Sequence, residues 1–414
     1  MNPLHLSGYG VKIKVKNLRS RSDLHVTDGR DNFRGEPSTY TFRPRRIQYD
    51  SIIIDGHSGY ISLQAFHWLS RNKVPLFILS YDGSMISSIL PPGPVKADLR
   101  AAQIKASEDS KVKFSITNAI VRVKVSRNLQ VLDWLAQRYD IEKQVRLTKG
   151  EAFRLEKARS VADLRTVEGR VALRYWQAFS SVIPECFDFQ GRMTSSHQNN
   201  ASDPVNLALN YAYGVLEGEC RAAINTVGLE QSVGFLHETS GYQTKQSLVY
   251  DLEEPFRWIA DVTVMEAFES RVLDLPDFYF IGDDYRYRFE SEAKQRFLDL
   301  LRERFNASVR YNARMLKWDT VIEQKTVELG RYLTDRSGKL DFSGPSPNLR
   351  RVDDKYLRRR ILSLAQSEVR KSGIGKSTFH YLREKARSQG SFTVGTRTRA
   401  ILLGTRRLSP NQLV

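Results

Sequence analysis

Two glutamates and one histidine in the middle of the chain, Glu217, His237 and Glu254, are of the residue types that hold a catalytic metal ion. Carboxylate oxygens combined with one imidazole nitrogen suit a hard divalent ion, Mg²⁺ or Mn²⁺, better than a structural zinc ion. In phosphoryl transfer such an ion binds phosphate oxygens, stabilises the developing charge and activates an attacking hydroxyl or water. The residue types therefore predict phosphodiester chemistry, although each of the three residues also has a structural interpretation.

Glu217 belongs to a helix predicted to begin at Asp203-Pro204, because Asp is a favoured N-cap residue and Pro suits the first helical position. One stripe of this otherwise apolar helix is polar, at spacings of four, three and four residues: Asn206, Asn210, Tyr213 and Glu217. Gly214 and Gly218 flank the glutamate, cost helix stability and would let a bulky group approach its carboxylate. The structural alternative is an amphipathic helix whose polar side faces water.

His237 follows a short apolar stretch and is one of seven histidines; a lone histidine in such a place is more often structural than a ligand. A polar loop and a strand-like segment, Leu248–Tyr250, come next, and then Asp251 and Glu254 before Pro255. Because a residue before proline is biased away from helical geometry, Glu254 has an alternative role as an N-cap, and Asp251 as a cap of the turn. Capping explains one acidic residue here more readily than three, since Glu253 is acidic too.

The first 95 residues are predicted to form a small β-domain. Val11–Val15 alternates apolar and basic residues, which is typical of a strand with one buried face. Asp-Gly turns separate further expected strands: Tyr40–Phe42, Ser51–Ile54 and Leu76–Leu79. One short helix, Leu63–Ser70, interrupts the strands, and the breaker cluster Pro91–Pro94 ends the domain.

Residues 96–335 carry apolar side chains at three- and four-residue spacing, which predicts a large helical domain. Residues 336–348 are rich in Gly, Ser and Pro and are predicted to be a linker. Residues 349–414 then form a separate basic domain. The expected fold class is α+β: a small N-terminal β-domain, a large all-α domain and a C-terminal helix–turn–helix domain.

The net charge of +17 points to a polyanionic partner, and nucleic acid is the best candidate. No apolar run is long enough to span a membrane, and the first ten residues lack the layout of a signal peptide. Cys186 and Cys220 lie far apart and suit a reducing compartment. We therefore expect a cytoplasmic protein without a membrane partner.

The tail concentrates this charge, because residues 349–414 contain 16 lysines and arginines against four acidic residues. Residues 353–388 are predicted to form a helix–turn–helix unit with its turn at Ser372–Gly375. The second helix, Ser377–Arg387, would bury Phe379 and Leu382 and enter the major groove of DNA. Its expected outward, DNA-facing residues are Lys376, Thr378, His380, Arg383 and Arg387. The structural alternative is a basic helical hairpin packed on the rest of the protein.

Several segments in order resemble the CRISPR-associated integrase family. In the helical region they are Asn206–Glu217, Val227–Leu229, Gly234–His237 and Tyr250–Arg257. In the first domain they are Gly8–Gly10, His57–Ala65 and Val74–Gly83. The similarity covers residues 5–335 and both domains, so the combined pattern is highly specific.

The resemblance implies a β-domain for dimerisation, with a homodimer or higher oligomer on DNA, and a helical catalytic domain. It assigns metal binding to Glu217, His237 and Glu254, and a catalytic role of less certain nature to Asp251. Arg257 and Lys245 are expected to contact DNA. The implied reaction is attack of a DNA 3′-hydroxyl on a phosphodiester of target DNA, a transesterification that needs no ATP.

Within this family, the linker and basic tail resemble casposases, the integrases of self-mobilising transposons. Some archaeal CRISPR integrases carry a segment similar to Gly373–Thr378, so spacer integration together with a partner protein is the alternative. A third hypothesis, a non-catalytic DNA-binding scaffold, is disfavoured by the intact set of Glu217, His237 and Glu254. The sequence thus predicts a casposase-type integrase.

Overall fold

The computed structural model describes residues 1–18, 21–30, 37–56, 58–192, 201–237, 246–282, 286–335, 340–347 and 349; in the tail it describes 358, 361, 362, 364, 374–388, 394, 398 and 402. Contacts between residues divide the chain into two units, which are described separately below. The first is Met1–Lys124 with Arg192–Pro345, and the second is Val125–Gly191 with Ser346–Val414. Within the described residues, no helix combines the length and apolar character needed to cross a membrane.

The N-terminal part of the first unit contains a mixed four-stranded sheet in the order β1-β5-β7-β8. β1, β5 and β7 are parallel, and β8 is antiparallel to β7. The bounds are β1 Pro3–Ser7, β5 Ser51–Asp55, β7 Leu76–Leu79 and β8 Met85–Ile89. Every residue of β5 is buried, as expected of a parallel strand that is covered on both faces.

A second four-stranded sheet has the order β4-β3-β2-β6. Its strands are β2 Val11–Leu18, β3 Arg21–Thr27, β4 Thr39–Phe42 and β6 Gly59–Ile61. Helix α1, Leu63–Arg71, packs with this sheet in one apolar core and begins at Ser62, whose side chain accepts the N–H of Ala65. The predicted β-rich N-terminal region, its alternating strand at Val11–Val15 and its single short helix are therefore confirmed.

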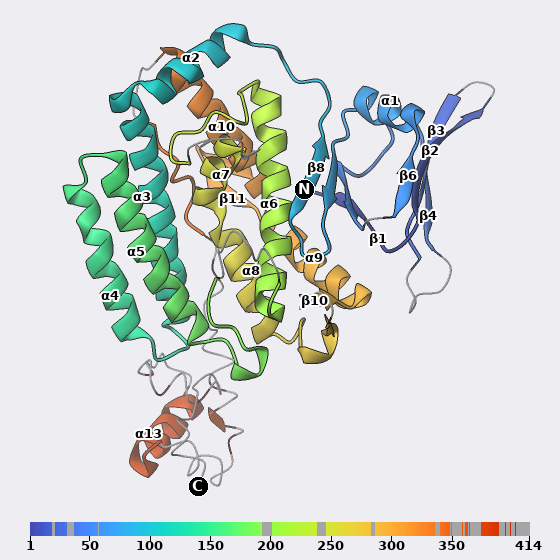
Figure 1. Ribbon diagram of the computed structural model, residues 1–414. Coiled ribbons are helices and arrows are strands. Elements are labelled where there is room, and N and C mark those ends of the chain that lie inside the picture. The colour runs from blue at the N-terminus through green and yellow to red at the C-terminus, as the bar shows by residue number, and fades with distance from the viewer. Residues whose placement is uncertain are drawn as a thin grey trace. The chain divides into compact units, whose positions relative to one another are not determined.

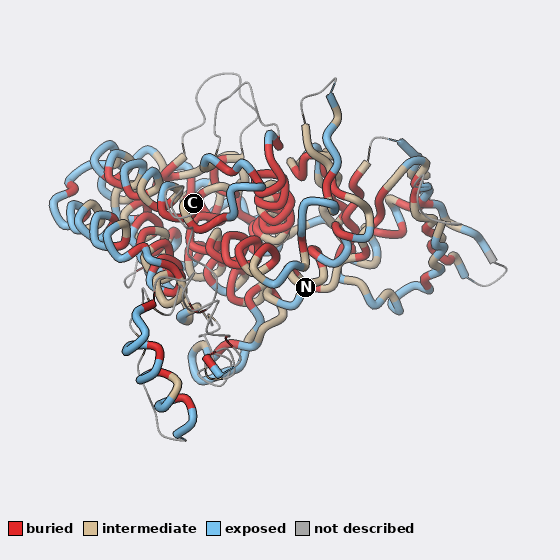
Figure 2. Tube along the Cα trace, turned by 90° about the horizontal axis from the view of Figure 1, so that it is seen from below, coloured by how far each residue is buried: buried red, intermediate tan, exposed pale blue. Residues whose placement is uncertain are grey.

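Helices make up most of the remainder of the first unit. They are α2 Ala97–Glu108, the first part of α3 Ser110–Leu135, α6 Pro204–Val227, α7 Ser247–Glu253, η3 Glu254–Phe256, α8 Trp258–Glu269, η4 Leu275–Asp277, α9 Ser291–Asn306 and α10 Trp318–Asp335. Figure 1 shows α7, α8 and α10 gathered around α6, which is buried along most of its length (Figure 2). Two hairpins that the sequence did not indicate also occur: β9 Phe278–Ile281 with β10 Arg286–Phe289, and β11 Val309–Tyr311 with β12 Arg314–Leu316.

The second unit contains the rest of α3 and a helical pair. These helices are α4 Glu142–Ala152, η1 Phe153–Lys157, α5 Val161–Ser180 and η2 Glu185–Phe187, followed in the tail by α13 Lys376–Arg387. In the tail, α13 buries Phe379 and Leu382 as predicted, in a small core with Ile361 and Leu364. Ser372 and Gly373 of the predicted turn and most of the predicted first helix lie outside the described residues, whereas Ile374 belongs to the small core and Gly375 directly precedes α13.

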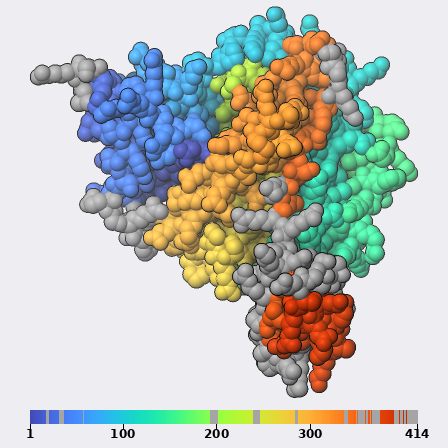
Figure 3. Space-filling view, turned by 180° about the vertical axis from the view of Figure 1, so that it is seen from behind, coloured from blue at the N-terminus to red at the C-terminus, as the bar shows by residue number. Residues whose placement is uncertain are grey.

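The β region packs directly on α6. Figure 3 shows residues of the β region beside those of α9 on one face, and Lys294 of α9 forms a buried ion pair with Asp55 at the end of β5. Asp55 also accepts a hydrogen bond of 2.8 Å from the Tyr211 hydroxyl of α6. One side chain from α9 and one from α6 therefore contact the buried carboxylate of Asp55 in β5. These polar contacts fix the β region against α6.

Two glycines of α6 make this packing possible. A Cβ on Gly214 would lie 2.2 Å from the carbonyl oxygen of Gly83, in the turn between β7 and β8, and one on Gly218 would lie 3.4 Å from the ring of Phe77. The prediction that these glycines admit a bulky group to the Glu217 carboxylate is therefore wrong. They admit the β7–β8 hairpin, because the small residues of α6 face the β region.

Replacing Gly214 with alanine is expected to destabilise the protein by about 1–3 kcal/mol, since the new methyl group overpacks against a backbone oxygen. Gly169→Ala is the matched control: Gly169 also lies within a helix, and nothing surrounds its would-be Cβ within 4 Å. That control should stabilise by roughly 0.5–1 kcal/mol through helix propensity. Thermal unfolding of both variants checks the prediction, and shifts of the same sign would contradict it.

Candidate active site

A buried carboxylate of α7 organises the loop that carries His237. Asp251 is fully buried, and its two oxygens accept the backbone N–H groups of Phe235, Leu236 and His237, the last two at 3.0 and 2.9 Å. The same carboxylate lies 2.8 Å from Nδ1 of His237. Because a carboxylate oxygen accepts, Nδ1 is the ring nitrogen that donates here, and in the neutral form of the ring the lone pair is on Nε2. This carboxylate–histidine arrangement is the one that orients metal-binding histidines in proteins.

The segment predicted as a strand, Leu248–Tyr250, is instead part of helix α7. Its apolar residues Leu248, Val249 and Leu252 are all buried, and a short apolar run does not distinguish a buried strand from a buried helix. Asp251 is therefore a residue in the middle of the helix and does not cap the turn, as the alternative interpretation had it. Its partners belong to the loop 14 to 16 residues earlier in the sequence.

Glu254 begins the short helix η3 and lies between three cationic or imidazole groups. Its backbone is helical, with φ −53° and ψ −43°, so the interpretation of Glu254 as an N-cap is wrong. Its carboxylate lies 2.7 Å from Nζ of Lys124, 3.6 Å from a guanidinium nitrogen of Arg257 and 3.8 Å from Nε2 of His237. Burial raises the pKa of Glu254, but Arg257, Lys124 and His237 outweigh it and lower the pKa to about 2. The carboxylate is therefore ionised at neutral pH.

Arg257 joins this carboxylate to a second polar cluster. Its guanidinium also contacts Glu253 at 3.5 Å and lies 5.1 Å from the ring centre of Tyr213, whose hydroxyl donates to Asp261. Burial raises the pKa of the Glu253 carboxyl above its usual range, and Arg257 opposes this. Arg257, which was expected to contact DNA, is thus engaged with carboxylates of its own chain.

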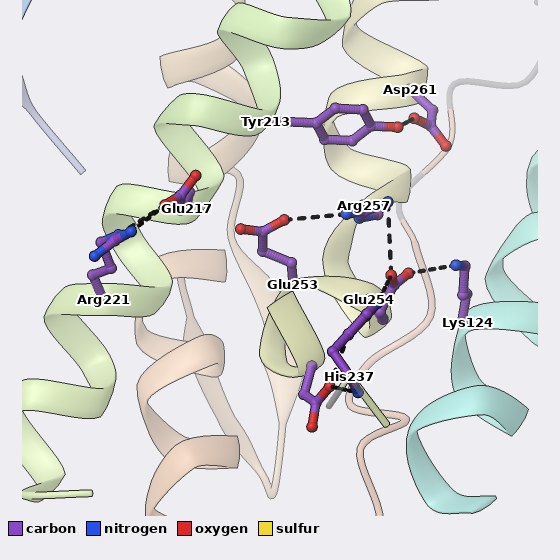
Figure 4. A network of polar contacts seen from close by, with 10 residues as sticks. Lys124, Tyr213, Glu217, Arg221, His237, Glu253, Glu254, Arg257 and Asp261 are labelled. Atoms are coloured by element: carbon purple, nitrogen blue, oxygen red, sulfur yellow. Dashed lines mark hydrogen bonds and ion pairs between the residues drawn. The ribbon is translucent and has the colours of Figure 1, made fainter. Parts of the chain in front are cut away.

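Glu217 is paired with an arginine on its own helix. Its Oε1 atom lies 2.6 and 2.8 Å from two guanidinium nitrogens of Arg221, one turn further along α6. Burial raises the pKa of Glu217, and Arg221 opposes this. Asn206 and Glu217 of the polar stripe are buried, and the Tyr213 hydroxyl donates a hydrogen bond to Asp261 of α8. The alternative interpretation, in which the polar side of the helix faces water, is therefore wrong. Figure 4 shows Glu217 beside Arg221 and on the side of α6 that faces Glu253.

The structure brings His237 and Glu254 together, whereas Glu217 faces Arg221. Within the described residues, no three His, Cys, Asp or Glu side chains are close enough to hold a metal ion. The donor atoms of two of the three candidate ligands, His237 and Glu254, nevertheless suit a divalent ion. The His237 side chain is 40% exposed, its Nε2 lies 3.8 Å from the Glu254 carboxylate, and in the neutral ring this nitrogen carries a lone pair that can bind a metal ion. The Glu217 carboxylate, the third candidate ligand, is instead paired with Arg221.

Three further charged residues of the site were not predicted: Lys124, Arg221 and Glu253. Arg221 follows Glu217 by four residues, a spacing at which helix neighbours of opposite charge pair, so a search of the helix face for counter-charges would have found it. Lys124 belongs to α3, 130 residues before Glu254 in the sequence. No local pattern marks such a contact.

The predicted DNA-facing residues of the tail lie on α13. Lys376, Thr378, His380 and Arg387 are exposed, and Arg383 is half-buried. This exposure is compatible with the expected recognition helix, whose contact with DNA stays a prediction. Lys245 lies outside the described residues.

The fold resembles those of solved integrases and related proteins. A structure titled "Casposase bound to integration product" aligns with a TM-score of 0.78 and 35% sequence identity, covering 88% of this chain and 99% of that one. The Cas1 protein of Thermotoga maritima aligns with a TM-score of 0.64 at 15% identity, covering 80% and 97%, which indicates a shared fold.

Sequence comparison assigns the family. The model of the CRISPR-associated protein Cas1 family matches residues 19–303, so the chain belongs to that family. A relative named CRISPR-associated endonuclease Cas1 1, from Methanospirillum hungatei, is 28% identical over 339 residues, which cover 81% of this chain and 97% of the relative. Another, from Thermus thermophilus, is 30% identical over 64% of this chain and 76% of its own length. The predicted family resemblance is confirmed.

Proposed function

We propose that the protein is a divalent-metal-dependent DNA integrase of the casposase type. It joins the 3′-hydroxyl ends of mobile-element DNA to target DNA, acting as a homodimer or higher oligomer on both DNA partners. The observation that carries the proposal is the contact of His237, oriented by Asp251, with the ionised carboxylate of Glu254. The 35% identity to a casposase over nearly the full length of that protein supports the type of reaction.

The proposed step is a transesterification. The donor 3′-oxygen forms a new bond to a target phosphorus, and the bond from that phosphorus to the target 3′-oxygen breaks. The attacking hydroxyl loses its proton and the leaving oxygen gains one, so one phosphodiester replaces another. No ATP is required because the number of phosphodiester bonds is unchanged.

Each residue of the site has a separate proposed role. His237, through Nε2, and Glu254 would hold Mg²⁺ or Mn²⁺, and Glu217 would join them once it has left Arg221. Such an ion stabilises charge on the phosphate oxygens. Asp251 fixes the histidine ring and its tautomer, while Lys124 and Arg257 hold the Glu254 carboxylate in its ionised form.

A strand-transfer assay tests the proposal. Purified protein, Mn²⁺ or Mg²⁺, a short duplex with terminal-repeat ends and a plasmid should yield joined product without any other protein. The same reaction in EDTA should yield none. Tight DNA binding with no product under either metal would reject an enzymatic role and favour a DNA-binding scaffold.

A CRISPR spacer integrase is the second candidate function. It is favoured by the curated relatives, which are named CRISPR-associated endonucleases. Strict dependence of joining on a second protein would assign the chain to this function, and joining by the purified chain alone would assign it to the casposase type.

Removing residues 349–414 is expected to weaken DNA binding and to flatten its dependence on salt. The removed segment carries 16 of the 64 lysines and arginines, and each lost phosphate contact lowers the slope of log K against log salt by about 0.9. Titration of a labelled duplex at several salt concentrations measures the slope. An unchanged slope would exclude the tail from DNA binding.

A further inference from the structure

Three lysines stand in a row along the middle of the second β-sheet. Lys12, Lys14 and Lys16 occupy alternate positions of β2 and are exposed, whereas Val11 and Ile13 are buried. Because successive side chains of a strand point to opposite faces, the three lysines share one face, with about 6.7 Å between neighbours along the strand. β3 pairs with β2 from Lys12 to Leu18, whereas β6 pairs only with Val11–Ile13. Lys12 therefore lies between two strands, and Lys14 and Lys16 lie beside β3 and past the end of the β6 pairing.

The neighbours of these lysines on the same face leave the charge uncompensated. In register, Lys14 pairs with His25 and Lys16 with Asp23. Asp23 is the only acidic residue in strands β2, β3, β4 and β6 as described, and its carboxylate is paired at 3.0 Å with Nε of Arg21. Within the described residues, no ion pair involves the three lysines. We call this surface, formed by Lys12, Lys14, Lys16 and His25, the lysine face.

The pKa of His25 is lowered, mainly by burial. Among the charged neighbours, Lys16 lowers this pKa by more than Asp23 raises it, and Lys14 lowers it further. The charges around His25 are therefore positive on balance. The buried side of the sheet, by contrast, packs with α1 in an apolar core, and the alternation of side chains along β2 places the lysine face on the opposite side of the sheet.

We infer that the lysine face binds the phosphate backbone of duplex DNA, as a contact separate from both the metal site and the tail. A row of like charges repels a second copy of itself, whereas a polyanion of regular charge spacing complements it. Lysines act on phosphates as point charges, so this contact holds DNA in place without reading its sequence. The inference rests on the proposed DNA function and adds to it the surface that positions the duplex.

Binding of a labelled duplex of about 30 base pairs tests the inference, measured in EDTA from roughly 50 to 200 mM salt. The variant K12Q/K14Q/K16Q is expected to lose about 2.7 from the slope of log K against log salt. Its affinity should then fall about forty-fold less than that of wild type over this salt range. The matched control K105Q/K143Q/K157Q removes three other exposed lysines and should keep the wild-type slope, while K12R/K14R/K16R should restore it.

An unchanged slope in the first variant, or an equal loss in the control, would overturn the inference. Unchanged DNA binding with lost binding to vesicles that contain phosphatidylserine would also overturn it and assign the face to lipid. Circular dichroism with thermal unfolding shows that the variant is folded. The assay needs neither divalent ion nor strand joining, so failure of the proposed integrase reaction would leave its outcome readable.

Discussion

Replacing His237 with alanine is expected to lower strand joining at least about 10³-fold, to the level of the reaction without divalent ion. The imidazole is one of the two proposed metal ligands that lie next to each other in the structure, and Asp251 contacts its Nδ1, so that Nε2 is the nitrogen proposed to bind the ion. Duplex affinity should stay within about twofold, because phosphate contacts elsewhere carry DNA binding. Strand transfer and EDTA-buffered binding, measured on the same preparation, separate the two effects.

His67→Ala is the control for this variant, since His67 of α1 is exposed and has no proposed role. Mn²⁺ titration followed by electron paramagnetic resonance gives a second readout, in which His237→Ala should bind the ion more weakly and His67→Ala as wild type does. A large loss of DNA binding or of thermal stability in His237→Ala would mean that the histidine is structural.

Replacing Asp251 with alanine should combine a loss of stability with a loss of activity. The change removes the acceptor for three backbone N–H groups and for Nδ1 of His237. Phe235 and Leu236 are buried, so water cannot readily replace the carboxylate, and each unsatisfied donor costs about 1–3 kcal/mol. We expect destabilisation by roughly 3–5 kcal/mol and joining reduced by about 10–100-fold.

The conservative variant Asp251→Asn separates the two roles. Its carbonyl oxygen can still accept from the loop, so it should recover part of the stability, whereas its amide group cannot accept and leaves the histidine ring less well oriented. Asp140→Ala, at an exposed position, should leave thermal unfolding and joining unchanged. Wild-type unfolding in Asp251→Ala would show that the carboxylate does not hold the loop.

The fold was predictable where the sequence is periodic. The alternation at Val11–Val15 and the Asp203-Pro204 start of α6 are both confirmed, because strands and helix N-termini have strong local signatures. The segment Leu248–Tyr250 was predicted to be a strand but is helical, because a short run of buried residues shows neither the helical nor the strand periodicity. The hairpin β9–β10 was not predicted either.

The candidate site was predictable as a set of residue types but not as a set of contacts. His237 and Glu254 do lie next to each other. The role of Asp251, however, depends on the loop at residues 235–237, whose backbone N–H groups contact its carboxylate. Lys124 contacts Glu254 from a helix far away in the sequence, and Glu217 is paired with Arg221. Such pairings are decided by tertiary packing, which composition and spacing do not encode.

The hydrogen bonds between Asp251 and the loop that ends at His237 determine which mutations this loop can tolerate. The carboxylate recognises main-chain N–H groups, which every residue except proline possesses. The position of the histidine is therefore independent of the chemical identity of residues 235 and 236, provided that they fill the same apolar space. Replacing Leu236 with methionine should change stability and activity little. Proline at that position would remove a hydrogen-bond donor to Asp251, so the His237 ring would no longer be held in place.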